Sequence, residues 1–364
     1  MKRRTPSQRN SRRGATAVLV TFLMVPMLAM TSFAVDYGYL LVVQTDLQRA
    51  ADAAAIAAVQ DLIPAADGTQ DLAAVRARVR EYAALNYPDV TSFQVLDADI
   101  QIGRYDPATI YSNITLLETG VLDTVQVTLR RDALANSPVA LFFAPILGIK
   151  TSAVTATATA VLQKANILKP GTPILPFSVP LDVWNSKNPG ETWSIYGDGK
   201  LTDSAGATIP GNWGTIDIGS TSNSTSDLVD QISNGLRQSD LDELADDGRI
   251  PSNTQIDGSQ PMWAQADTGL SSGIKSAVKA AHGETRLVPI YDALDGNLTG
   301  NNTEFHVVGW GVVEVVTSNW KGAHNTYVTI MKSYMYNSVL VPTSDLSVTT
   351  GLIEGAYTSP ALIK

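Results

Sequence analysis

The longest apolar stretch of the chain lies near its amino end. Residues 14–35 are mostly apolar and contain no charge, and Asp36 is the first charged residue after them. A helix of 22 residues extends roughly 33 Å, enough to cross a hydrocarbon core of about 30 Å. Six Lys/Arg lie in residues 1–13, and such basic flanks stay on the cytoplasmic side. The pattern predicts a membrane-spanning helix with the rest of the chain outside the cell membrane.

The helical spacing of apolar residues continues beyond the first charge. It runs from Val35 to Leu47, and an alanine-rich stretch follows at 50–58. Pro26 lies in the presumed span, where a kink is tolerated. We therefore expect one continuous helix over Gly14–Ile63, whose small residues permit close lateral contacts with other subunits.

A cleavable secretory signal is the alternative interpretation of this apolar run. Ser32-Phe33-Ala34 before Val35 has the small-x-small pattern of a cleavage site. The apolar region is longer than the 7–15 residues or so that are usual for a signal, and the helical periodicity does not stop at this site. Both observations favour an uncleaved anchor.

The region after the helix shows alternating and helical patterns in turn. Helical spacing predicts a helix over Asp71–Asn86, and an apolar segment with Phe142 and Phe143 occupies Ala135–Leu147. We expect this apolar segment to be core, with anchoring of the two Phe in the outer membrane leaflet as the alternative. Alternation predicts strands at Phe93–Tyr105, Thr124–Leu129 and Ser152–Leu162.

A Pro/Gly-rich interruption near 164–173 predicts a boundary, and a meander of three long strands closes the second half. The fold class expected is α+β: a long N-terminal transmembrane helix followed by a mixed, largely antiparallel β body. The three strands are expected at Thr285–Tyr291, Thr303–Thr317 and Tyr327–Val341. The predicted parts are a cytoplasmic tail (1–13), the span (14–36), its extracytoplasmic continuation (37–63), an α+β domain (64–165) and a β-rich domain (166–364).

Composition narrows the classes of function. The chain has no Cys, which excludes disulfides, thiolate nucleophiles and Cys-based metal sites. Removing the six basic residues of the tail from 26 Lys/Arg leaves 20 against 35 Asp/Glu, a net charge of −15 for the remainder. Such a surface repels nucleic acid, so we expect no nucleic-acid partner.

Three groups of residues stand out along the predicted helix: Arg12-Arg13-Gly14 before the apolar run, Val35-Asp36-Tyr37-Gly38 at its end, and Leu47-Gln48-Arg49-Ala50-Ala51-Asp52-Ala53 with the alanines after it. Together they resemble the TadE/TadG-like Flp pilus-assembly proteins, and this resemblance implies a pilin-like N-terminal helix. Weaker similarity follows at Phe142-Phe143, Ile146-Leu147-Gly148 and Val154–Ala160. The resemblance implies a bacterial inner-membrane protein of a tight-adherence pilus or secretion apparatus, in contact with membrane lipid and other subunits of that apparatus.

One position departs from the pattern of processed pilins. Prepilins carry Glu five residues after the cleaved Gly, whereas Leu19 stands five residues after Gly14 here. This difference argues against processing at Gly14 and favours a permanently anchored accessory component. Asp36 is then expected to be an interfacial helix residue.

Catalytic and metal chemistry have weak support. Gly269-Leu270-Ser271-Ser272-Gly273 matches G-x-S-x-G, which needs a strand before Ser271, and Gln260–Thr268 does not look like one. A helix cap is the better interpretation, so we expect no enzyme, although a hydrolase using Ser271 stays an alternative. Three separated His predict no metal site, no cofactor is expected, and the acidic stretch 240–248 is expected to be a solvated helical face.

The six Trp residues all lie in the second half. We expect at least three in the core, and Trp213 and Trp263 are candidates for an interface with a protein or cell-wall glycan. The favoured function is therefore a membrane-anchored envelope component that acts by tethering and docking. A tethered glycan- or protein-binding module is the second hypothesis.

Overall fold

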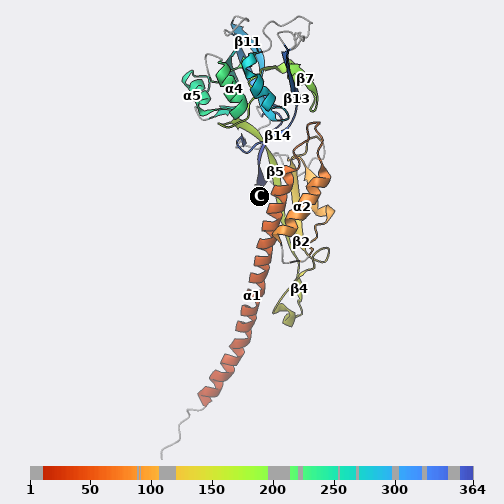
Figure 1. The fold of residues 1–364 in the computed structure, drawn as a ribbon. Coiled ribbons are helices and arrows are strands. Elements are labelled where there is room, and N and C mark those ends of the chain that lie inside the picture. The colour runs from red at the N-terminus through yellow and green to blue at the C-terminus, as the bar shows by residue number, and fades with distance from the viewer. Residues whose placement is uncertain are drawn as a thin grey trace, which may run out of the picture.

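The computed structural model describes residues 11–87, 90, 92–105, 120–195, 214–219, 224–252, 255–267, 270–296, 303–321, 326–342 and 353–363. Over these residues it has a long helix and a mixed, mostly antiparallel β body, which confirms the predicted α+β class. Figure 1 shows two lobes stacked end to end, with the first half of helix α1 projecting from the lower one. We call these the first lobe, which contains α2, β2 and the start of β5, and the second lobe, which contains β7 to β13.

Helix α1 is continuous over Ser11–Gln60, so the predicted unbroken helix is confirmed. Its 50 residues extend roughly 75 Å, and Pro26 lies inside it. It ends three residues before the expected Ile63 because residues 61–63 turn ahead of Pro64, and the residue before a proline is disfavoured in a helix. None of the apolar window that could span a membrane is buried, whereas Leu47 and five of the alanines after it are fully buried: Ala50, Ala51, Ala54, Ala55 and Ala58.

The first lobe is a sheet covered on one face by α1 and α2. The predicted second helix is confirmed as α2 (Leu72–Asn86), and its N-cap Asp71 accepts the N–H groups of Ala73 and Ala74. β2 and β5 pair antiparallel from Thr124↔Val161 to Arg131↔Val154. The strand order is β1 (Ile100–Gly103), β2 (Thr124–Arg131), β5 (Val154–Leu168), β16 (Ala356–Ile363) and β14 (Met335–Tyr336).

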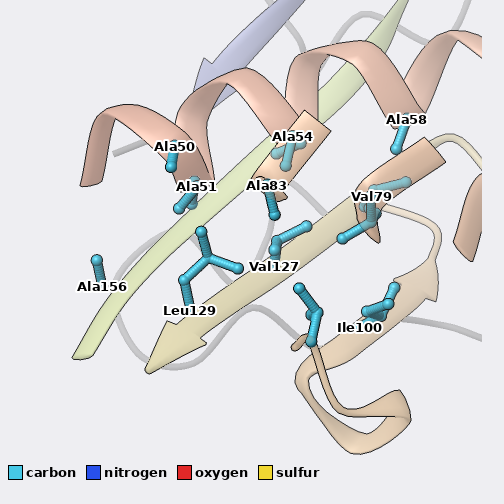
Figure 2. Packing of buried hydrophobic residues seen from close by; sticks show 14 of the residues in the cluster. Ala50, Ala51, Ala54, Ala58, Val79, Ala83, Ile100, Val127, Leu129 and Ala156 are labelled. Atoms are coloured by element: carbon cyan, nitrogen blue, oxygen red, sulfur yellow. The ribbon is translucent and has the colours of Figure 1, made fainter. Parts of the chain in front are cut away.

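Small side chains bring α1 close to this sheet. Ala50, Ala51, Ala54 and Ala58 have no exposed surface, and Figure 2 shows them facing the sheet that carries Val127 and Leu129. Because a methyl group holds a helix off its neighbour less than a branched side chain does, the alanine face sets a short distance between helix and sheet. This part of the small-residue face is therefore used within the chain, and the lateral contacts expected of it with other subunits are ruled out there.

The predicted strand at Phe93–Tyr105 is mostly wrong. Only β1, its residues 100–103, pairs as a strand, and Asp97–Asp99 form a short 3-10 helix. Phe93 and Val95 are buried without strand pairing. The alternation of apolar and polar residues therefore indicated which side chains are buried, but it did not indicate a strand. Asp99 is also buried, where its carboxylate pairs with Arg130 of β2.

The second lobe contains a seven-stranded sheet in the order β6, β11, β12, β10, β8, with β13 pairing β12 and β7. Its strands are β6 (Val179–Pro180), β7 (Thr192–Ile195), β8 (Thr215–Ile216), β10 (Met262–Asp267), β11 (Thr285–Gly296), β12 (Thr303–Trp320) and β13 (Thr326–Lys332). Its helices are α3 (Leu181–Ser186), α4 (Thr225–Asn234), α5 (Gln238–Asp246) and α6 (Lys275–Ala280).

The predicted meander is confirmed, because β11, β12 and β13 pair antiparallel in sequence order. The third predicted strand, Tyr327–Val341, is broken after Lys332. Its remainder forms β14 and β15 (Val341–Pro342), which pair with β16 and β5 of the other sheet. The chain therefore returns from the second lobe to the first by way of residues that were expected to stay in the meander.

Strand β5 links the two lobes. Its first part pairs with β2, and its end at Ile167 and Leu168 pairs with β9 (Ile256–Asp257) and β15. The predicted boundary between residues 165 and 166 lies inside this strand, and the division into domains stays a prediction.

Candidate membrane-side interface

The residues that suggested a pilus-assembly family fall at three levels of α1. Arg13 and Gly14 are in its first turn, Val35, Asp36 and Gly38 lie where the exposed half ends, and Gln48 to Ala53 lie inside the first lobe. A Cβ added at Gly38 would meet no atom within 4 Å, so packing does not explain that glycine.

Asp36 contacts a hairpin more than one hundred residues further along the chain. Its Oδ1 accepts the N–H of Phe142 at 2.8 Å, and its Oδ2 accepts the N–H groups of Phe143 at 3.0 Å and Ala144 at 2.7 Å. These donors begin the 3-10 helix η3 (Ala144–Leu147), where free N–H groups favour a negative charge. Asp36 is only 5% exposed. It is therefore a buried clamp between α1 and the hairpin, which the expectation of an interfacial helix residue missed.

The hairpin consists of β3 (Val139–Ala140), η3 and β4 (Thr151–Ser152), with Val139 paired to Ser152. The expectation that Ala135–Leu147 is core is wrong for most of this segment. Val139 is fully buried, and Ala135 is buried, but most of the apolar side chains beyond them are exposed. Phe142 is 63% exposed, Ile146 83% and Leu147 79%. Pro145 lies at the start of η3, and Gly148 ends it in the left-handed region at φ +90°. Together they turn the chain back between β3 and β4.

An apolar groove separates the hairpin from α1. It has a volume of about 440 Å³ and is lined by both elements, with Val25, Leu28 and Phe33 from the helix and Phe143, Ile146 and Leu147 from the hairpin. Figure 1 shows the hairpin, labelled at β4, pointing from the first lobe along the free half of α1. Tyr39 of α1 contacts the ring of Phe142 edge-on, with centroids 5.1 Å apart.

The third group of motif residues joins α1 to the sheet. The Nε2 of Gln48 donates to the Asp52 carboxylate at 2.8 Å and to the carbonyl of Thr157 in β5 at 3.1 Å. Ala50 and Ala51 are fully buried, and Ala53 is half-buried. These residues hold the helix against β5, which makes α1 an integral part of the lobe.

The candidate aromatic interface is only partly described. Trp213 lies outside the described residues. Trp263 in β10 is 38% exposed and lies against His306, with ring centroids 4.8 Å apart. Trp184 and Trp310 are buried, whereas Trp193 and Trp320 are half-buried against a core.

Ser271 is positioned as a cap. Its Oγ accepts the N–H of Gly273 at 3.3 Å and lies 2.9 Å from the hydroxyl of Thr225. A strand, β10, does precede it, so the expectation of no strand there is wrong. The hydroxyl nevertheless contacts another hydroxyl, and the rings of His282 and His306 bond Ser318 and Asp292.

The acidic stretch 240–248 is not simply a solvated face. Asp240 is 1% exposed and pairs with Arg237, whose Nε donates to it at 2.8 Å. Asp217 lies nearby and is equally buried; its carboxylate accepts from the Gln231 side chain and from the N–H of Ser224. Burial, and then the Asp227 carboxylate, raises the pKa of Asp217 to about 7.

Within the part of the chain that the structure describes, α1 is the one helix long and apolar enough to cross a membrane. A helix of this kind that continues into a small α+β lobe is typical of proteins held in a membrane by a single helix, and this chain has that arrangement. Residues 14–61 match the family model of putative Flp pilus-assembly TadE/G-like proteins, and residues 57–160 match that of putative Tad-like Flp pilus-assembly proteins. Residues 14–160 of this chain are therefore similar to Tad-type pilus-assembly proteins, as the motif residues indicated. No curated protein and no solved structure matches the chain.

The two family matches cover the parts that form one packed unit. The first model ends where α1 ends, and the second runs through α2, the hairpin and most of the first part of β5. The clamp between Asp36 and η3 joins a residue of one model to residues of the other. Both families are pilus-assembly proteins of structural character, which supports a role related to Flp/Tad pili and contact with other pilus-assembly subunits. The sole sequence signal that linked Asp36 to the hairpin was that both segments resembled the same family.

Proposed function

We propose that this protein is a permanently anchored component of a Flp/Tad-type pilus assembly or secretion apparatus, acting by tethering and by docking to its other subunits. In this proposal α1 crosses the cytoplasmic membrane once, with the basic tail inside and both lobes outside. The observation that carries the proposal is the continuity of α1. The helix that is bare and apolar in its first half supplies the buried alanine face of the first lobe in its second half.

This continuity leaves no flexible linker between anchor and body. The Gln48 bonds and the alanine packing fix α1 to β5, so the position and tilt of the helix determine where the lobes lie. It also supports the uncleaved form of the chain. The candidate cleavage site, Ser32-Phe33-Ala34, is helical and lies just before Asp36, which is bonded to the hairpin. Proteolysis there would require local unwinding of the helix, because a peptidase cleaves extended backbone.

The anchor is tested in the native host with the full chain. Because the sequence has no Cys, single substitutions Ser7→Cys and Val316→Cys give unique labelling sites in the tail and in the second lobe. We expect a membrane-impermeant maleimide to label Val316→Cys in spheroplasts and Ser7→Cys only after lysis. The reverse pattern, or a chain that begins at Val35 and is free in the medium, would overturn the proposal.

Tethering is tested separately from topology. A variant in which residues 1–36 are replaced by a cleavable secretory signal should export the body and fail to support pilus assembly. Restoration of assembly by this released body would show that the anchor is dispensable.

An anchored binding module is the second candidate function. It is favoured by Trp263, which is 38% exposed on β10 and lies beside the ring of its cross-strand neighbour His306. Exposed Trp side chains are enriched at binding interfaces. This function would operate from the same anchor, so the two candidates differ in what the second lobe contacts.

A further inference from the structure

We propose that the tip of the β3–β4 hairpin, residues 141–149, is a second membrane contact that enters the outer leaflet of the bilayer crossed by α1. Its ligand is lipid: acyl chains against the exposed apolar side chains, and phosphate groups at the base of the hairpin. The inference rests on the proposed anchor and adds a second point at which the body meets the membrane.

The tip has the surface of a membrane-inserted element. No charged residue occurs from residue 133 to residue 149, and Phe142, Ile146, Leu147 and Ile149 are each more than half exposed. Exposed apolar residues clustered on one short element mark an interaction site rather than ordinary surface. Shallow burial of such residues among acyl chains is how monotopic elements bind membranes.

The position of the tip sets it at the membrane. Asp36 is the first charged residue after the apolar run, so α1 would leave the bilayer near it. The hydrogen bonds from Phe142 and Ala144 to Asp36 hold the start of η3 at this level. The groove between the two elements extends down to Val25, 11 residues or roughly 16 Å earlier in the helix. Phe33 and Tyr37 stack at the same level of α1, as expected of an aromatic belt at the interface.

The backbone of the tip is prepared for an apolar environment. The N–H groups of Phe142, Phe143 and Ala144 donate to Asp36, and Leu141 donates to the carbonyl of Lys150. Ile146, Gly148 and Ile149 donate to carbonyls within the tip, and Pro145 has no N–H. Unsatisfied donors are costly in hydrocarbon, whereas water would satisfy them without this arrangement. The combination of bare apolar side chains with satisfied donors is the reason to choose lipid over an aqueous partner.

The base of the hairpin has the charge that a phosphate layer requires. Lys150 follows the tip and is exposed, and Arg131 lies half-exposed at the other end, where it donates to the carbonyls of Asn136 and Ser137. Cations at this depth attract lipid phosphates. The neighbouring carboxylate of Asp132 is paired with Arg130 at 3.1 Å, so it does not neutralise these two residues.

A second contact would restrict how the body moves. A single helix can tilt within the bilayer and carry the lobes with it, whereas a second contact at the tip limits this tilt. The body would then stand at a constant angle to the membrane when it meets other subunits of the apparatus.

Fluorescence quenching by lipid tests the inference on the full-length protein. Single-cysteine variants Ile146→Cys and Leu147→Cys carry a polarity-sensitive fluorophore, with Met24→Cys as the probe of the anchor and Val316→Cys as an exposed apolar site in the second lobe. The proteins are reconstituted in vesicles of phosphatidylethanolamine and phosphatidylglycerol, with or without bromine on the acyl chains. We expect brominated lipid to quench the labels at positions 24, 146 and 147 and to leave the label at 316 unchanged.

The other outcomes separate the two proposals. Quenching at 24 without quenching at 146 and 147 would overturn the hairpin contact and leave the anchor intact. Absence of quenching at 24 would overturn the anchor and the hairpin contact with it. Unquenched tip labels, together with disulfide formation between copies of the unlabelled Ile146→Cys variant under oxidising conditions, would show that a second copy of the chain covers the tip instead of lipid.

Discussion

Removal of the Asp36 carboxylate is the sharpest test of the link between the two Tad-type regions. In Asp36→Ala the three N–H groups of Phe142, Phe143 and Ala144 lose their acceptor. A hydrogen bond to a charged group contributes about 1.5–3 kcal/mol, so the three bonds together set an upper limit of roughly 9 kcal/mol. The tip can open to water without unfolding the lobe, so we expect a smaller effect, about 2 kcal/mol.

Amide hydrogen exchange in detergent micelles measures this opening directly. A cost of about 2 kcal/mol corresponds to roughly 30-fold faster exchange in the peptide that contains residues 141–149. Protection in α2 and in β5 should stay the same, because neither element depends on the clamp. Asp46→Ala is the matched control: Asp46 lies on the same helix and makes only an exposed ion pair with Arg49, worth at most about 0.5 kcal/mol. Unchanged protection at residues 142–144 in Asp36→Ala would refute the role assigned to the carboxylate.

Three further changes probe other parts of the molecule. Because burial raises the pKa of Asp217 to about 7, the folded state binds its proton more tightly than the unfolded state does, and stability should fall as pH rises from about 4 to about 7. Asp217→Asn should remove this loss of stability, which is at most about 4 kcal/mol. Identical pH profiles of the unfolding free energy in urea for the wild type and for Asp217→Asn would contradict this expectation. Ala54→Leu should overpack α1 against the sheet and lower the stability by about 1–3 kcal/mol. The control Ala53→Leu, at a half-buried position, should be tolerated. Equal melting temperatures of the two variants would count against close packing of α1 on the sheet. Trp263→Ala should weaken capture of glycan or partner with little change in stability, and undiminished capture would exclude the second candidate function.

Several features follow from local sequence and needed no tertiary information. The uncharged run from residue 14 to residue 35 is long enough to span a membrane, and the helical spacing beyond it predicted that the helix continues. Asp71 caps α2 through donors two and three residues away, so its role is readable from sequence. The three-strand meander was also predictable, because strand pairing between neighbours needs only alternation and short connections.

Tertiary structure decided the features that join distant segments. Alternation at Phe93 and Val95 reported that the side chains are buried, but whether a partner strand lies beside them is a non-local matter. The third meander strand was broken because β14 and β15 pair with strands of the other sheet. The alanine pattern of α1 predicted close packing with other subunits, but in the folded chain the neighbour of Ala50 to Ala58 is this chain's own sheet.

The clamp and the exposed tip show the same limit most clearly. An apolar segment with two Phe is core in most soluble domains, and composition does not distinguish a buried segment from one that projects beside a membrane helix. What distinguishes them is the acceptor for three backbone N–H groups, supplied by a carboxylate 106 residues earlier in the chain. Sequence determined by itself that α1 is an apolar helix and that Asp36 is its first charge. Only the folded chain brings that charge to the start of η3, because hydrogen bonds across such a separation exist once the sheet has placed both segments side by side.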